Sequence, residues 1–188
     1  MRGRYVTSTV AMLAAGLLLL LPVAGAPAKA PAIAKLLPAS NELKGWAAIA
    51  NTDTHCASSK ELHKIYNGGD GEYIKAGVTE AYQRTYKNGT VLATVVVHRF
   101  GTDWQKAKAL CTKRVSGISK TKGFTTVKVK NAGCYGPVPG GQLLGYSWTG
   151  YYMARYEFSS QNTAGAMQAF MKNVTGKVAS LLAAKSAK

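Results

Sequence analysis

The sequence predicts an α+β fold: one domain built on an antiparallel sheet, in which two hairpins are each followed by an amphipathic helix packed on the sheet. Two turn signals carry this prediction, Asn88-Gly89 between apolar runs and Thr149-Gly150 between strands of alternating aromatic residues. After each hairpin, apolar residues recur at the helical period, first from Asp103 and then near the C-terminus. We therefore expect a single folded unit over residues 40–184.

The first 28 residues have the layout of a secretory signal peptide. Arg2 and Arg4 precede an uncharged apolar run that closes on small residues ending at Ala28. We therefore expect export, cleavage after Ala28, a secreted or periplasmic location, and no transmembrane segment in the mature chain. An uncleaved signal that acts as an anchor is the alternative. Residues 29–39, rich in alanine and proline, are expected to form a flexible leader.

The first half of the domain is expected to hold a short strand, a helix and a hairpin. The strand lies around Trp46–Ala50, and the helix over Ser59–Tyr66 begins with the spacing of a capping box. Strands over Thr79–Lys87 and Val91–Phe100 flank the Asn88-Gly89 turn. The second of these strands is apolar on both faces, which predicts a central position in the sheet.

The second half is expected to contain two helices with strands between them. The first, capped by Asp103, has a predicted buried stripe of Trp104, Ala107, Cys111 and Val115. A strand is predicted over Phe124–Lys130, and a stiff loop over Gly136–Gly141 that interrupts pairing. The last helix begins near Asn162 and is expected to lie across the sheet through Met167, Phe170, Met171, Val174, Val178 and Leu181.

The chain is strongly basic, with 24 Lys+Arg against 8 Asp+Glu and a formal net charge of +16. No acidic residue lies in the stretch from Trp104 to Tyr156. This stretch predicts a positive face for an anionic envelope polymer or an acidic protein, without specific nucleic-acid recognition. The residues expected to bind are Lys120, Lys122, Lys128, Lys130 and Arg155. A simpler interpretation remains open, because exposed lysines also keep a secreted protein soluble.

Three cysteines in an exported chain predict one disulfide and one free thiol. Cys111 falls on the buried face of a predicted helix, and Cys56 and Cys134 lie next to predicted elements. A bridge from Cys111 to Cys134 is favoured, and Cys56 to Cys111 is nearly as plausible, because spacing does not determine connectivity. The Cys-x-x-Cys pattern is missing, so redox, haem and zinc-ribbon chemistry are unsupported.

Catalytic candidates are few. Cys56 with His63 is one nucleophile-and-base pair that the sequence offers, and the loop Asn67–Glu72 clusters oxygen ligands with glycines. The sequence lacks the His-Glu-x-x-His motif of zincin metalloproteases, the ligand pattern of an EF-hand calcium loop, and the Gly-x-Ser-x-Gly nucleophile elbow of hydrolases. We therefore predict a non-catalytic binding or structural module of the bacterial envelope, with no cofactor and no metal. The alternative is a hydrolase-type envelope enzyme that uses Cys56/His63 or this loop.

Part of the chain resembles a family of secreted bacterial proteins known as domain of unknown function 6599. The segments similar to its opening motif are Leu37-Pro38, Gly45-Trp46 and Tyr66–Gly77, and the strand Val95–Gly101 is similar to the one that follows. This chain departs from the family at Asp70–Glu72, where the family has Ala-Glu-Leu. The resemblance implies an extracytoplasmic bacterial α+β domain and supplies no catalytic residue.

Overall fold

The structure is a computed structural model that describes residues 32–186, so the predicted signal peptide over residues 1–28 lies outside the described residues. One antiparallel sheet of 8 strands has the order β1-β3-β4-β8-β7-β6-β5, with β2 also paired to β3. The strands are β1 (Ala47–Ala48), β2 (Thr54–Cys56), β3 (Glu80–Asn88), β4 (Val91–Arg99), β5 (Thr125–Val127), β6 (Ala132–Val138), β7 (Gln142–Thr149) and β8 (Tyr152–Phe158). The α-helices are α1 (His63–Tyr66), α2 (Gly71–Lys75), α3 (Trp104–Ile118) and α4 (Ala164–Ser186), and the 3-10 turns are η1 (Ala32–Leu36), η2 (Ser59–Glu61) and η3 (Gln161–Thr163).

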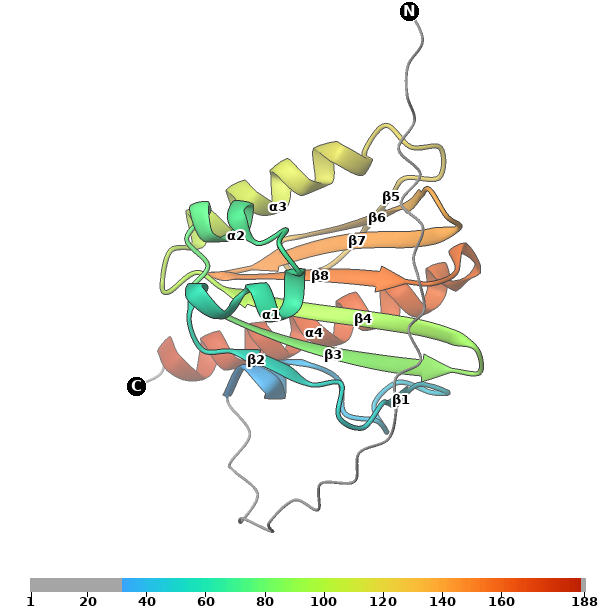
Figure 1. Ribbon diagram of the computed structural model, residues 1–188, viewed down its shortest axis with the longest axis horizontal. Coiled ribbons are helices and arrows are strands. Elements are labelled where there is room, and N and C mark those ends of the chain that lie inside the picture. The colour runs from blue at the N-terminus through green and yellow to red at the C-terminus, as the bar shows by residue number, and fades with distance from the viewer. Residues whose placement is uncertain (1–31, 187–188) are drawn as a thin grey trace, which may run out of the picture.

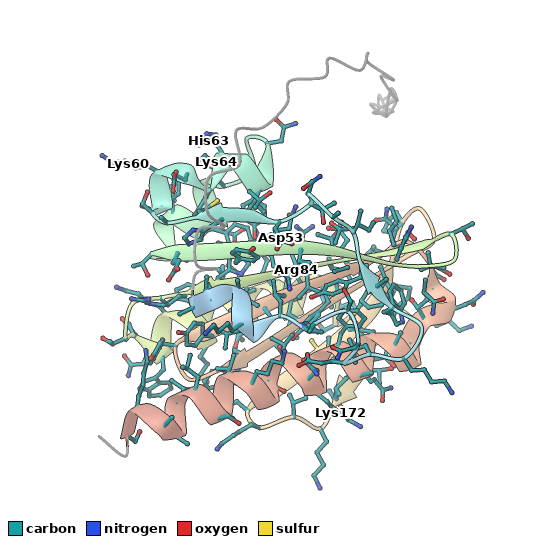
Figure 2. The ribbon with its side chains drawn as sticks, turned by 90° about the horizontal axis from the view of Figure 1, so that it is seen from below. Asp53, Lys60, His63, Lys64, Arg84 and Lys172 are labelled. Carbon is teal, nitrogen blue, oxygen red and sulfur yellow. The ribbon has the colours of Figure 1, made fainter. Side chains whose placement is uncertain are left out.

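The sheet separates two layers of helices. Helices α1, α2 and α3 lie on one face and α4 crosses the other (Figure 1). The view from below places Lys60, His63 and Lys64 on one side of the sheet and Lys172 of α4 on the opposite side (Figure 2). The predicted α+β class, with one domain and helices on an antiparallel sheet, is confirmed. Within residues 32–186, no helix is both long enough and apolar enough to cross a bilayer.

The two predicted hairpins meet in the middle of the sheet. Strand β4 pairs with β8 over seven positions, from Ala93 opposite Phe158 to Arg99 opposite Tyr152. As expected, β4 is central and buried on both faces: Val95 and Val97 face α4, whereas Val96 faces the α2 and α3 layer. The predicted inner face of α4 is also confirmed, because five of its six residues are buried.

Both hairpin turns lie one residue later than predicted. Asn88 pairs with Val91, so the turn residues are Gly89 and Thr90. Thr149 likewise pairs with Tyr152. In each turn only the glycine has a positive φ, +57° at Gly89 and +53° at Gly150. Since glycine adopts this conformation at the lowest cost, its position determines the turn, and the preceding residue continues the strand.

The predicted stiff loop over Gly136–Gly141 is partly wrong, because its first half belongs to β6. Strand β6 pairs along its whole length with β7, and Pro137 lies opposite Leu143. Pairing of β5 with β6 stops at Tyr135. On the side away from β7, Pro137 therefore has no partner strand among the described residues. Its missing N–H costs no hydrogen bond between strands there.

The predicted burial was wrong at Trp104, and the expected flexible leader is partly folded. Trp104 is 48% exposed, and the buried stripe of α3 begins one turn later, with Ala107, Leu110, Cys111 and Ile118. Residues 32–39 of the expected flexible leader are described: they include η1, and Ile33, Leu36 and Leu37 are buried in the core shared with α4. This segment is therefore part of the folded domain.

Candidate functional site

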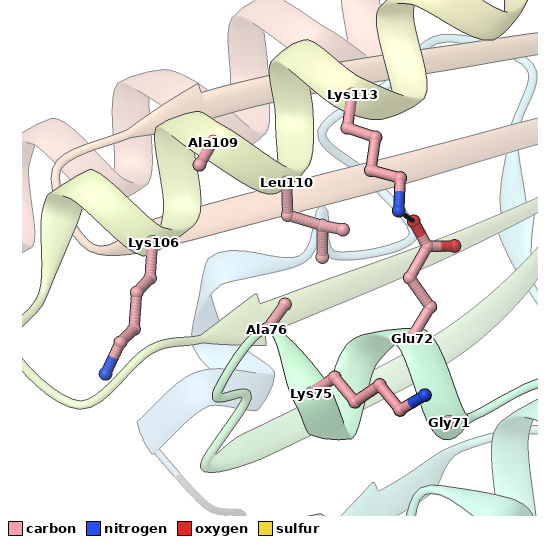
Figure 3. Close-up of a pocket in the computed structure, with 8 residues that line it drawn as sticks. All are labelled: Gly71, Glu72, Lys75, Ala76, Lys106, Ala109, Leu110 and Lys113. Atoms are coloured by element: carbon pink, nitrogen blue, oxygen red, sulfur yellow. Dashed lines mark ion pairs between the residues drawn. The ribbon is translucent and has the colours of Figure 1, made fainter.

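A hollow of about 700 Å³ lies between α2 and α3 on the face of the sheet opposite α4. Figure 3 shows the residues of both helices that line it. They are Gly71, Glu72, Lys75, Ala76, Lys106, Ala109, Leu110 and Lys113. This volume is in the range of small-molecule sites in proteins. Small side chains line the floor, and lysines occupy the rim.

Local sequence explains why the hollow stays open. Asn67 ends α1 in the left-handed conformation, which lets the chain reverse into the short helix α2. On α3, Asp103 caps the first turn by accepting hydrogen bonds from the backbone N–H groups of Gln105, at 3.0 Å, and Lys106, at 3.1 Å. Where the two helices face each other, Ala76 and Ala109 are too small to fill the space between them. The buried Leu110 closes the bottom.

The rim is basic and accessible. Lys106 and Lys113 have side chains that are 57% and 71% exposed. The stem of Lys106 lies against Gly77, where a Cβ on the glycine would stand 3.1 Å from the lysine Cδ atom. The Lys106 Nζ is 3.4 Å from an Asp103 oxygen, and Lys113 Nζ is 3.1 Å from Glu72. Because exposed ion pairs are weak, an incoming anion can compete for both ammonium groups.

A second hollow, of about 440 Å³, continues the first along α3 and shares Glu72 and Lys113 with it. Here Arg114 joins the lining, and its guanidinium lies 2.6 Å from the Glu72 carboxylate and 4.8 Å from the centre of the Tyr73 ring. Glu72 thus contacts two cations at once. Since one carboxylate balances one cation, the surroundings of Glu72 keep a net positive charge.

Three stacked rings join α2 to α1 and to the sheet. The ring centroids of Tyr66 and Tyr73 are 4.2 Å apart, and those of Tyr73 and His98 are 4.8 Å apart, with planes within 14° of parallel. His98 is fully buried; its Nδ1–H donates to the Met153 carbonyl at 3.3 Å, and Tyr66 O–H donates to Nε2. The stack fixes the position of α2, and with it the Glu72 side of the hollow.

Stability is expected to fall as the pH drops below the pKa of unfolded histidine. Burial lowers the pKa of His98 from 6.5 to about 3. Between these values the unfolded chain binds a proton that the folded chain does not, so the His98 contribution is complete above pH 6.5 and is lost toward pH 3. The free energy of unfolding should fall by about 1.4 kcal/mol per pH unit in this window. Urea unfolding at several pH values measures the slope.

The control for this experiment is His98→Gln, which keeps a donor and an acceptor but does not titrate. We expect its stability to change much less over the same pH range. An equal slope in the two proteins would show that His98 is not the group responsible.

The predicted pair of Cys56 and His63 is not assembled for catalysis. Cys56 is buried, its thiol donates to the Glu61 carbonyl at 3.0 Å, and burial raises its pKa. His63 is exposed and its Nδ1 lies 2.9 Å from the Lys60 carbonyl oxygen. A nucleophilic cysteine needs the opposite shift, toward the thiolate. This geometry does not support the Cys56/His63 enzyme hypothesis.

The loop Asn67–Glu72 serves structure and charge pairing. Gly68 has a φ of +91° and follows the left-handed Asn67, so together they terminate α1. The Glu72 carboxylate at the end of the loop is directed to Lys113 and Arg114. Among residues 32–186, no three His, Cys, Asp or Glu side chains are grouped closely enough to hold a metal ion.

The structure contains no disulfide: Cys56, Cys111 and Cys134 are all free and buried. The favoured Cys111–Cys134 bridge and the alternative Cys56–Cys111 bridge are both absent from it. Cys111 and Cys134 do share the apolar layer between α3 and the sheet. The count of cysteines suggested pairing, but whether two side chains meet in bonding geometry depends on packing that spacing does not reveal.

All three thiols are expected to be unreactive in the folded protein. Burial raises the pKa of Cys111 to about 12 and that of Cys134 to about 11, so thiolate is scarce at neutral pH. A thiol reagent should therefore modify none of them quickly under native conditions and all three after unfolding in denaturant. Recovery of one reactive thiol in unfolded protein would instead indicate a disulfide.

The structure separates the residues of the sequence-predicted basic face. Lys120, Lys122, Lys128 and Lys130 are exposed in the connections that flank β5. Within residues 32–186, none of these four lysines pairs with a carboxylate. Arg155 belongs to β8 instead, where its guanidinium lies 3.0 Å from Glu157 and 5.9 Å from the Tyr66 ring centroid. Whether this set binds an anion stays a prediction.

The hollow between α2 and α3 was not predicted. Lys106 and Lys113 lie in the acid-free stretch, but Lys75 belongs to a different part of the sequence. One signal was available: Lys106, Ala109 and Lys113 follow one another at spacings of three and four, which places them on one side of a helix. What the sequence did not show is that α2 lies opposite this side.

Comparison with known protein families and with curated proteins finds no match. Among solved structures, the chain is similar to the extracellular domain of PknH from Mycobacterium tuberculosis. The sequences are 14% identical, the match covers 77% of this chain and 95% of that chain, and the TM-score is 0.49. At this identity and TM-score, the similarity carries no argument about function.

Proposed function

We propose that this protein is a non-catalytic, extracytoplasmic binding module that holds an anionic ligand in the hollow between α2 and α3. The observation that carries the proposal is the composition of this hollow: three lysines on the rim, one carboxylate, and an apolar floor at Ala76, Ala109 and Leu110. Such a site favours a ligand with acidic groups and an apolar surface between them. The extracytoplasmic location rests on the signal-like N-terminal sequence.

The chemistry of the lining favours binding over catalysis. None of the eight residues that line the hollow is a serine, cysteine or histidine. Its carboxylate, Glu72, is already paired with Lys113 and Arg114. The lysines act as exposed cations, which attract acidic groups over several ångströms and select weakly among them.

A titration with poly-L-glutamate tests this proposal. Calorimetry should show binding at low salt that weakens steeply as salt is added, because exposed charges are screened beyond about 10 Å at 0.1 M salt. Ala109→Glu, which places a carboxylate over the floor, should weaken binding by about tenfold or more. Binding that is undetectable at low salt would contradict the proposal.

Ala183→Glu is the matched control. Ala183 is exposed on α4, as Ala109 is on α3, but it lies across the sheet from the hollow, so the substitution adds the same charge away from the site. Its effect on affinity should stay within about threefold. Equal losses in both variants would mean that net charge, rather than the hollow, controls binding.

A further inference from the structure

Three hollows adjoin one another around the surface of α3. The α2–α3 hollow shares Glu72 and Lys113 with the one beside Arg114, and it shares Ala109 with a hollow of about 360 Å³ at the start of the helix. Helix α3 has 15 residues, which corresponds to about 22 Å. The shared lining residues make these hollows one elongated track, which crosses over α3 at Ala109. A track of this shape suits a linear chain better than a compact small molecule.

At the start of the track, an aromatic surface is exposed. The hollow there is lined by Trp104, Gln105, Lys108, Ala109 and Thr112. Trp104 is 48% exposed, and its ring stacks on that of Trp148, with centroids 6.3 Å apart and planes at 17°. Because Trp148 backs the indole, Trp104 presents a supported flat face to the solvent, and little side-chain entropy remains to be lost on binding.

The neighbours of Trp104 determine what can lie on this face. Gln105 and Thr112 offer neutral donors and acceptors, and Lys108 offers a cation without a carboxylate partner among residues 32–186. A sugar ring matches all three features, because its C–H face packs on an indole while its hydroxyl groups hydrogen-bond at the ring edge. A carboxylate on the sugar would match the lysine. Polyphosphate has no apolar face to place on Trp104.

We infer that the ligand of the track is an acidic polysaccharide, with one sugar ring stacked on Trp104 and carboxylates of the following sugars at Lys106 and Lys113. This inference rests on the proposed function and adds to it a ligand class and a second contact region. Charge complementarity supports a chain occupant, since Lys108 lines the hollow at Trp104, Lys106 lines the α2–α3 hollow, and Lys113 lines both the α2–α3 hollow and the one beside Arg114.

The test compares three probes: a galacturonic acid hexamer, the neutral maltohexaose, and polyphosphate. For the native protein we expect the acidic hexamer to bind and to change tryptophan fluorescence, and maltohexaose to bind much more weakly. Trp104→Ala should weaken binding of the acidic hexamer by about tenfold, in line with the loss of one stacking contact, and should leave polyphosphate binding unchanged. Trp104 is half exposed, so the variant is expected to fold, and thermal unfolding checks this.

The remaining outcomes distinguish the polysaccharide inference from the proposed anion-binding function. If Ala109→Glu abolishes binding of every acidic probe but Trp104→Ala changes none, the hollow binds anions and the polysaccharide inference is overturned. If no acidic probe binds, both proposals fail. A single-stranded oligonucleotide, or vesicles of anionic phospholipid, that bound more tightly than the acidic hexamer and depended on Trp104 would also overturn the inference, in favour of nucleic acid or a membrane surface.

Discussion

Replacing Phe170 with alanine is expected to lower the free energy of unfolding by about 3–5 kcal/mol, the range for emptying a fully buried phenylalanine site. Phe170 of α4 is 0% exposed and meets three other rings edge-on. Its ring centroid is 5.4 Å from that of Trp46, 4.9 Å from that of Tyr86, and 5.3 Å from that of Phe158. These rings come from elements that are distant in sequence, so the cavity cannot close without moving the sheet against the helix.

Urea unfolding followed by circular dichroism measures this loss. Leu92→Ala is the control, because Leu92 is 45% exposed and its truncation should change stability by less than about 0.5 kcal/mol. A loss below about 1 kcal/mol for Phe170→Ala would contradict the described packing of α4.

Reversing the charge of the three rim lysines is expected to produce the largest loss of binding. The combined variant Lys75→Glu, Lys106→Glu and Lys113→Glu replaces three attractions with three repulsions around one hollow. Affinity for an acidic polymer should fall by at least about 30-fold, and the slope of affinity against salt should become shallower because fewer counterions are exchanged. Calorimetry at several salt concentrations provides both quantities.

The matched control carries the same change in net charge at the sequence-predicted basic face. This control combines three substitutions in the connections that flank β5: Lys120→Glu, Lys122→Glu and Lys128→Glu. If the hollow is the site, this control should weaken binding only through the long-range field, by about fivefold or less. A larger loss in the control than in the rim variant would assign binding to the basic face and contradict the hollow.

Local signals in the sequence were sufficient for the elements that depend on local chemistry. Asp103 caps the predicted helix because its carboxylate accepts hydrogen bonds from two backbone N–H groups of the same turn, which does not depend on distant parts of the chain. The apolar period through Met167, Phe170 and Val174 predicted the inner face of α4 for the same reason. The fold class followed from these signals together.

Properties that depend on distant parts of the chain were not predicted. Trp104 fits the helical period of the buried stripe, yet at the start of α3 it stacks on Trp148 and stays half exposed. The hollow requires α2 to lie opposite α3, an arrangement fixed by the Tyr73 and His98 stack rather than by any spacing along the sequence. The disulfide prediction failed for the same reason: Cys111 and Cys134 pack in the same apolar layer, but both are free thiols.

Lysine labelling with mass spectrometry, in the presence and absence of the galacturonic acid hexamer, tests the central claim most directly. The account predicts that bound ligand protects Lys75, Lys106 and Lys113 from acetylation, because their ammonium groups surround the hollow (Figure 3). Lys60 and Lys172, which lie elsewhere on the molecule (Figure 2), should be labelled at the same rate in both samples. Protection spread evenly over all lysines, or confined to Lys120, Lys122, Lys128 and Lys130, would contradict a binding site between α2 and α3.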